Sequence, residues 1–170
     1  MKILIEVEED DKVNRSAECE VSPEESVDAL AKRIAGQLGL EAEELVADLG
    51  VGDVRFEPNA RVGDYIEHGK RWRHRRVCID LRFESESNTH RFPAHSTWAR
   101  VRRWGCKHFH VSADACINLE LREGSPTGPP LNESSEIGVF TGCKTVWLVK
   151  PGPEPNGATT RKAQCRFNVR

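Results

Sequence analysis

Residues 145–150 read Thr-Val-Trp-Leu-Val-Lys, and Pro-Gly-Pro-Glu-Pro-Asn-Gly follows over residues 151–157. The first stretch is apolar, β-branched or aromatic at most positions and comes after a turn signal, Thr-Gly-Cys-Lys, which is typical of a β-strand. The prolines and glycines of the second stretch exclude regular structure. The sequence therefore predicts a folded body that closes on a strand and releases a flexible tail over residues 151–170.

Length and composition place the chain among soluble globular proteins. It has 170 residues, of which 38% are hydrophobic and 31% charged, enough for one ordinary domain or two small ones. No window approaches eighteen apolar residues, so we expect no membrane partner. The N-terminus becomes acidic too quickly for a signal peptide, and we predict a cytoplasmic protein.

The six cysteines are scattered and form no Cys-x-x-Cys pair. In a cytoplasmic protein this pattern favours free thiols over a disulfide framework. Cys106, His108, His110 and Cys116 superficially offer metal ligands, but the second ligand pair of a structural zinc site is missing. We therefore predict no metal site.

The formal net charge of −2 hides an asymmetry between the two halves of the chain. Residues 1–69 carry 7 Lys+Arg against 18 Asp+Glu, whereas residues 70–170 carry 18 against 9. Such a split predicts two units with different surfaces.

The first half shows a hairpin, a helix and further strands. The alternation of residues 3–7 and 17–21 predicts paired strands. Ser22, Pro23 and Glu25 form a capping-box start for a helix with Val27, Leu30, Ile34 and Leu38 on one side, which ends at Gly39. The remaining expected segments are strands at 44–49, 54–56 and 70–74 and a turn at 64–66.

The second half repeats this order with an offset of about 71 to 74 residues. Ser96 is the expected cap of a helix that carries Trp98, Val101 and Trp104. The other expected segments are strands at 77–83, 90–92, 116–121 and 145–150 and a short buried segment at 137–140. The sequence therefore predicts an internal duplication of a small fold.

This pattern resembles the β-grasp fold of ubiquitin-like proteins. The likeness is carried by residues 119–124, 130–132, 137–140 and 145–149, and by the helix entry at 22–27. It implies an α+β protein with two tandem β-grasp (ubiquitin-like) domains, at 1–75 and 76–150, and a flexible, proteolytically processed tail at 151–170. Similar two-domain modifiers are the interferon-induced vertebrate type and the bacterial type encoded in antiphage operons.

The resemblance implies a protein modifier without catalytic residues or a cofactor of its own. Its expected partners are an activating enzyme that uses ATP, a conjugating enzyme, a deubiquitinase-like metalloprotease and target proteins such as phage structural proteins. Such modifiers end in Gly-Gly, which this tail lacks. The implied processing segment is Cys165, Arg166, Phe167 and Asn168, with a mature end at Phe167 or, alternatively, at Gly157.

Three alternatives stay open at this point. Residues 70–76 and the helix face with Arg100, Arg102, Arg103 and Lys107 could bind nucleic acid, although we favour a closing strand whose arginines face the acidic first half. Trp147, with Val149 and Leu121, is the expected protein-interaction surface, but Trp147 suits a core position equally well. Finally, the chain could be a binding adaptor that is never conjugated. No enzyme motif is present.

Overall fold

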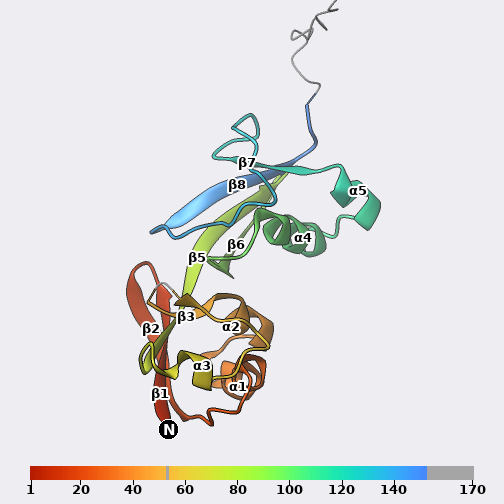
Figure 1. Cartoon of the computed structure of the whole chain (residues 1–170). Coiled ribbons are helices and arrows are strands. Elements are labelled where there is room, and N and C mark those ends of the chain that lie inside the picture. The colour runs from red at the N-terminus through yellow and green to blue at the C-terminus, as the bar shows by residue number, and fades with distance from the viewer. Residues whose placement is uncertain (53, 153–170) are drawn as a thin grey trace, which may run out of the picture.

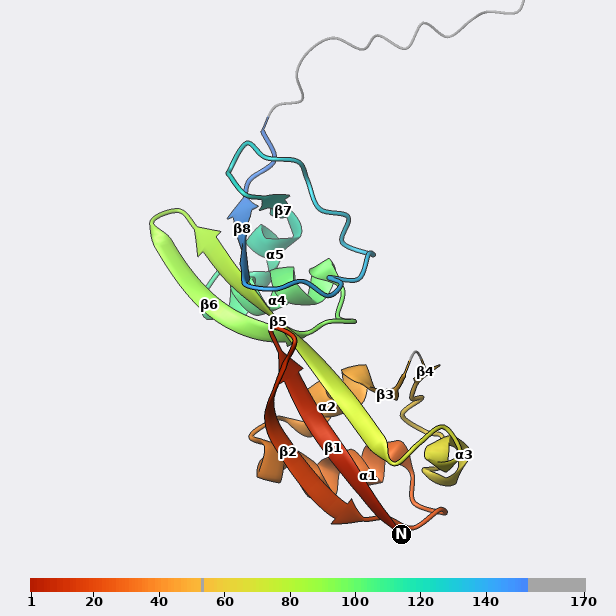
Figure 2. The same cartoon turned by 90° about the vertical axis from the view of Figure 1, so that its left-hand side faces the viewer.

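One mixed β-sheet runs through the whole molecule in the computed structural model, which describes residues 1–52 and 54–152 (Figure 1). The sheet contains eight strands, and strand β5 (Arg71–Phe83) pairs with strands of both halves. Figure 2 shows β5 as one long strand that passes from the lower to the upper part of the molecule. The predicted junction at residues 75–76 therefore lies inside a strand and not in a linker.

The N-terminal unit opens with the predicted hairpin. Strands β1 (Lys2–Glu9) and β2 (Lys12–Glu20) pair antiparallel, and β1 also pairs in parallel with β5. The remaining elements of this unit are α1 (Val27–Ile34), the 3-10 turn η1 (Ala35–Leu38), α2 (Ala42–Asp48), β3 (Leu49–Val51), β4 (Val54–Arg55) and α3 (Gly63–Ile66). Gly39 ends the helical segment in the left-handed conformation, at φ 62°, as expected for a glycine stop.

Helix α1 begins four residues later than predicted, because Ser26 and not Ser22 caps it. The Ser26 hydroxyl accepts a hydrogen bond from the amide of Ala29 at 3.1 Å. The carbonyls of Pro23 and Glu25 instead accept bonds from the amides of Gly63 and Val62, which keeps this segment extended.

The predicted strand at 44–49 is wrong, since most of this segment is helix α2. The amide of Leu45 donates to the carbonyl of Glu41 at 3.1 Å, as an α-helical turn requires. Alanine, glutamate and leucine are good helix formers, and the helix turns Leu45 and Val46 into the core. Only residues 49–51 form the strand.

The C-terminal unit begins within β5. Its elements are β6 (Glu86–Pro93), α4 (Trp98–His108), α5 (Ala113–Ile117), β7 (Glu120–Glu123) and β8 (Cys143–Val149). The predicted strand at 116–121 is mostly wrong, because Ser112 caps α5 through the amide of Ala115. Ser96 is buried next to α4 but does not cap it, and Thr97 holds the N-cap position.

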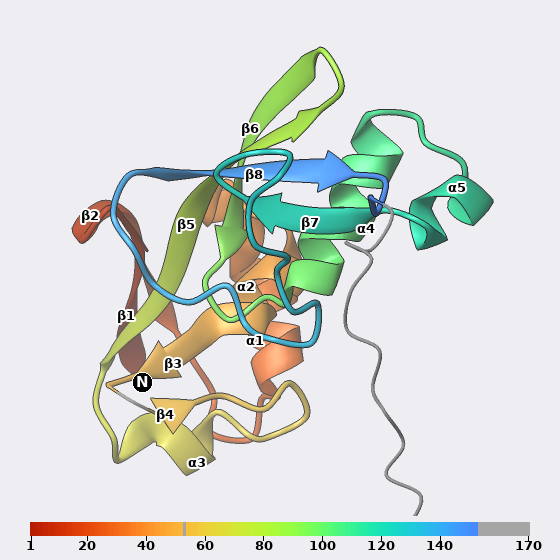
Figure 3. The same ribbon diagram turned by 90° about the horizontal axis from the view of Figure 1, so that it is seen from above.

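The same strand arrangement occurs in both units. In each, an antiparallel hairpin is followed by a helix, and the last strand lies in parallel beside the first: β5 beside β1, and β8 beside β5. Figure 3 looks onto β8 and β7, which lie side by side with α4 behind them. One apolar cluster runs from Ile3 to Trp72 and a second from Val77 to Leu148. The protein is thus an α+β fold of the β-grasp type.

Two disulfides lie in the C-terminal unit, so the prediction of free thiols is wrong for the four cysteines that form them. Cys78 and Cys143 face each other across the parallel pair β5 and β8, with Cα atoms 4.5 Å apart. Cys106 and Cys116 join α4 to α5, and Cys19 is a buried free thiol. Because disulfides persist mainly in oxidising compartments, cysteine usage no longer supports a cytoplasmic location. Among the helices described, none is long and apolar enough to span a membrane.

Candidate interaction surface

The outer face of the C-terminal sheet carries Trp147. Its strand neighbours Val146 and Leu148 are buried, so the alternation of β8 turns Trp147 to the opposite face, where it is half-buried. The strand register sets it between Arg82 on β5 and Arg122 on β7. The Arg82 guanidinium carbon lies 5.7 Å from the centre of the Trp147 ring, within cation–π range. A half-exposed tryptophan between two arginines is suited to contact a partner protein.

The other predicted interaction residues divide between this face and the core. Val149 shares the face of Trp147 and is half-buried. Leu121 belongs to the hydrophobic cluster and has no exposed surface, so its placement on an interaction surface is wrong. The reason is the alternation of β7, which turns Leu121 inward and Arg122 outward. Cys165, Arg166, Phe167, Asn168 and the alternative end Gly157 lie outside the described residues.

The basic stretch at 71–76 is part of the sheet, as the favoured interpretation predicted. Trp72 and His74 are fully buried. The outward arginines meet glutamates of the neighbouring strand β1, and the N–O distances are 3.6 Å for Arg71–Glu6, 3.2 Å for Arg73–Glu8 and 3.5 Å for Arg75–Glu8. These arginines therefore face the acidic side chains of the first unit, as the favoured interpretation predicted.

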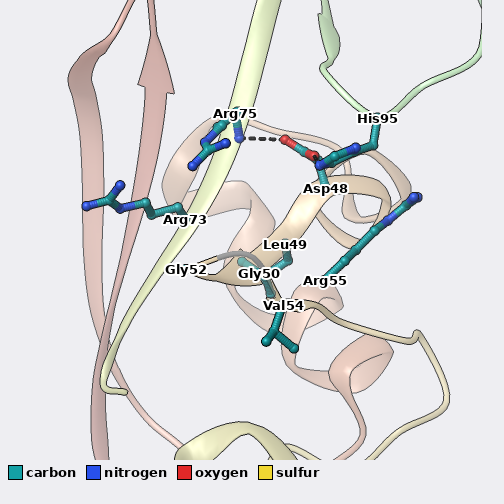
Figure 4. Close-up of a pocket in the computed structure, with 9 residues that line it drawn as sticks. All are labelled: Asp48, Leu49, Gly50, Gly52, Val54, Arg55, Arg73, Arg75 and His95. Carbon is teal, nitrogen blue, oxygen red and sulfur yellow. Dashed lines mark hydrogen bonds and ion pairs between the residues drawn. The ribbon is translucent and has the colours of Figure 1, made fainter. Parts of the chain in front are cut away.

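The two units meet at a group of charged side chains that the sequence did not indicate. His95 follows β6, and its imidazole lies between a carboxylate of each unit, 3.2 Å from Asp48 and 2.8 Å from Glu136. Arg55 also reaches Glu136, at 3.2 Å, and the second Asp48 oxygen accepts the amide of Arg75 at 2.7 Å. Figure 4 shows Asp48 and His95 in contact above Leu49 and Gly50, in the wall of a cavity of about 170 Å³.

Two carboxyl groups of this cluster, Asp48 and Glu136, have shifted pKa values, and burial is the main cause for Asp48. Burial raises the pKa of Asp48 to about 6, although the nearby His95 and the Arg75 amide act in the opposite direction. The hydrogen bond from His95 lowers the pKa of the exposed Glu136. The imidazole therefore ties an anionic side chain of the second unit to a carboxyl of the first whose charge changes near pH 6.

A second contact between the units lies at the β1–β2 turn. The Glu9 carboxylate is 3.2 Å from Arg76 and 3.4 Å from Arg91, and Asp10 is 3.1 Å from Arg91. Burial acts to raise the pKa of Glu9, but a hydrogen bond from Asn14 and the two arginines outweigh it and lower that pKa. Asp10 also accepts the amide of Gly142, in the segment that leads into β8. Together with the shared strand β5, these contacts fix one unit against the other.

No protein-family model matches the sequence, and no curated protein matches it either. Three solved structures share parts of the fold. An N-terminal ubiquitin-like domain has 16% identity and a TM-score of 0.36, covering 49% of this chain and 82% of that one. A structure described as molecular mimicry of SUMO in DNA repair has 15% identity and a TM-score of 0.35 over 44% of this chain and 90% of that one. A ubiquitin-like domain from Arabidopsis thaliana has 14% identity and a TM-score of 0.35 over 49% and 86%.

Proposed function

We propose that this chain is a ubiquitin-like protein modifier that is itself non-catalytic and is joined to target proteins through its C-terminal carboxylate. The observation that carries the proposal is the course of the last strand. β8 lies between β5 and β7 in the C-terminal part of the sheet and ends at Val149, two residues before Pro151. A carboxylate that follows such a strand is attached to a rigid body. An enzyme can bind this body and at the same time bind the end of the chain in its active site.

The proposed chemistry needs three partners. A metalloprotease of the deubiquitinase type hydrolyses a peptide bond of the tail and exposes a new carboxylate. The preferred cleavage position is after Phe167. An activating enzyme adenylates that carboxylate with ATP, releasing pyrophosphate, and its cysteine thiolate then displaces AMP to form a thioester. A conjugating enzyme receives the thioester, and a target amine displaces the thiol to form an amide bond.

Two features of the described residues support this scheme: the sheet face that carries Trp147, and the negative charge of the first unit. Trp147 with its flanking arginines offers a surface for the enzymes, on the strand that leads into the tail. The N-terminal unit, with 18 Asp+Glu against 7 Lys+Arg over residues 1–69, would add an acidic body to a target. In the antiphage setting that we propose, this body obstructs the assembly of phage structural proteins.

Intact mass spectrometry of the full chain, co-expressed with its genomic neighbours, tests the proposal. We expect loss of the mass of residues 168–170, or of everything after Gly157, together with adducts of the trimmed chain on other proteins. The matched control is a chain that ends at Gly152, which retains the body but should form no adduct. An unchanged full-length mass and no adducts would contradict the proposal.

The same sheet face favours a second candidate, a binding adaptor that is never conjugated. Its partner would bind Trp147, Arg82 and Arg122 without any covalent step. In that case a partner would copurify with the full chain and with the chain ending at Gly152 alike, and Trp147→Ala would abolish binding to both.

A further inference from the structure

A groove of about 500 Å³ lies on the N-terminal unit, between the start of α1, helix α2 and the segment after β4. Its floor is apolar and is formed by Val46, Phe56 and Pro58, of which the first two are buried. It lies on the helical side of the unit, since α1 and α2 supply part of its lining. The groove therefore combines apolar contact area with access from outside.

Carboxylates surround this apolar floor. Asp28, Glu43 and Glu57 line the groove, and only Asp28 is in an ion pair with a described residue, at 2.6 Å from Lys32. The one cation in the lining, Arg55, donates to the carbonyl of Ala47 and to Glu136. Glu43 and Glu57 are exposed and have no cation partner within residues 1–52 and 54–152. The groove thus favours an occupant that is both cationic and apolar.

The end of this chain has that chemistry. Residues 161–170 contain Arg161, Lys162, Arg166 and Arg170 and no acidic side chain. In the last six residues, Cys165, Phe167 and Val169 alternate with Arg166, Asn168 and Arg170. An extended segment with this alternation has one apolar and one cationic side, which match the floor and the rim of the groove.

We propose that residues 165–170 bind in the groove of the same molecule, with Phe167 on the floor formed by Val46, Phe56 and Pro58 and with Arg166 and Arg170 at Glu43 and Glu57. Phe167 comes fifteen residues after Gly152, and a stretch of that length spans about 50 Å at most when extended. β8 ends at the opposite end of the molecule from α1 (Figure 1).

The contact has a consequence for the modifier, and this step rests on the proposed function. A bound tail end keeps the cleavage position at Phe167 away from the protease. Removal of residues 168–170 deletes one apolar and one cationic contact, which weakens binding and releases the new carboxylate to the activating enzyme. The groove therefore acts as an intramolecular guard of the unprocessed tail.

Paramagnetic relaxation in the full-length protein tests the contact. A nitroxide is attached to Ala163→Cys in a Cys165→Ala background, since the described cysteines are disulfide-bonded or, for Cys19, buried. We expect broadening of the amides of Val46, Phe56 and Glu57. Glu43→Lys/Glu57→Lys should reduce this broadening at least threefold, and adding Arg166→Glu/Arg170→Glu should restore it.

The matched control is Glu20→Lys/Glu67→Lys, which makes the same charge change at two exposed positions outside the groove and should leave the broadening unchanged. Amide spectra verify that each variant is folded. Absence of broadening in the groove, or equal broadening in Glu43→Lys/Glu57→Lys, would overturn the proposal. A mixture of spin-labelled ¹⁴N protein with ¹⁵N protein that carries no spin label reports only contacts between molecules. Broadening of the groove amides in this mixture would also overturn the proposal, because the tail would then bind a second copy. Conjugation is read by mass, so either proposal can fail without the other.

Discussion

His74 is the fully buried imidazole of β5, and it makes the stability of the protein sensitive to acid. Burial lowers its pKa to about 3, and the positive charge of Arg76 acts in the same direction. In the unfolded chain the pKa of a histidine is near 6.5. Because the folded value is depressed, the unfolded state binds one proton more between pH 6.5 and 3, and the free energy of unfolding falls as the pH falls through this range.

We expect His74→Gln to remove this part of the acid sensitivity. Between pH 6 and 4 the wild type should lose up to about 1.4 kcal/mol per pH unit more than the variant, in addition to their common loss. Urea unfolding at several pH values measures the difference. His110→Gln, at an exposed position, is the control and should follow the wild type. Parallel pH profiles of His74→Gln and the wild type would refute the assignment.

Asp48 affects the pH dependence of the free energy of unfolding in the opposite direction to His74. Its folded pKa of about 6 is raised above the ordinary value of 3.8, so its contribution to stability is fully present below pH 3.8 and is lost as the pH rises through 6. In Asp48→Asn the side chain can still accept the Arg75 amide but no longer ionises. We expect this variant to gain about 2–3 kcal/mol at most relative to the wild type between pH 4 and 7.

Urea unfolding of Asp48→Asn at pH 4 and pH 7 measures this gain. Glu136→Gln is the paired comparison, because the pKa of Glu136 is lowered and its contribution is lost on acidification instead. The two variants should therefore diverge from the wild type in opposite directions as the pH rises. A constant offset between Asp48→Asn and the wild type at both pH values would exclude a raised pKa.

At the level of elements, helix α4 packs closely against side chains of the sheet at Gly105. A Cβ atom added there would clash with the side chain of Leu81 on β5 and would contact Leu148 on β8. Gly105→Ala should therefore lower the free energy of unfolding by about 1–3 kcal/mol, despite the better helix propensity of alanine. Thermal unfolding tests this, with Gly36→Ala as control. No atom lies within 4 Å of a Cβ at Gly36, so that change should be neutral or stabilising. Equal changes in thermal stability for Gly105→Ala and Gly36→Ala would contradict the close contact between Gly105 and Leu81.

The elements also show what sequence patterns determined and what they did not. The hairpin, the glycine stop at Gly39 and the last strand were predictable, because alternation and turn residues are local signals. In the predicted strand 44–49, residues 44–48 were assigned wrongly, because a short apolar pair such as Leu45-Val46 fits a strand or a buried helix equally well. Ser22 and Ser26 are both good caps, and only the backbone bonds to Val62 and Gly63 choose between them. The assignment of 1–75 and 76–150 as separate domains stays a prediction.

The candidate site was predictable only where alternation decides it. The outward position of Trp147 was one of two open alternatives, and the burial of Val146 and Leu148 decides between them. Leu121 was misplaced because β7 starts four residues later than the pattern 116–121 indicated, after a helix. The disulfides and the His95 contacts depend on strand register and on loops far apart in sequence, which no local spacing encodes.

For the whole molecule, the charge asymmetry of the sequence has a structural use, because acidic side chains of the first unit meet basic ones of the second. The ion pair between Glu9 and Arg76 is the most buried of these contacts that we consider, because the Glu9 side chain is 11% exposed and the Arg76 side chain 12%. In Glu9→Gln, Arg76 and Arg91 lose a shared carboxylate, although Glu44 still lies 3.9 Å from Arg76 and Asp10 lies 3.1 Å from Arg91. The loss of one partner from a largely buried site costs about 1–3 kcal/mol. We expect lower stability and a looser relative orientation of the two units.

Residual dipolar couplings of the two units test this prediction. In the wild type both units should fit one alignment tensor, because β5 and the Glu9 contacts hold them together. In Glu9→Gln the couplings of the second unit should shrink relative to those of the first, because fewer ion pairs then restrain the twisting of β5 between the units. Glu18→Gln is the matched control, because its ion pair with Lys2 is about two-thirds exposed and contributes little. If Glu9→Gln retains one common tensor and wild-type stability, the Glu9 contacts are not needed, and the shared strand with the contacts at Asp10 and His95 fixes the two units.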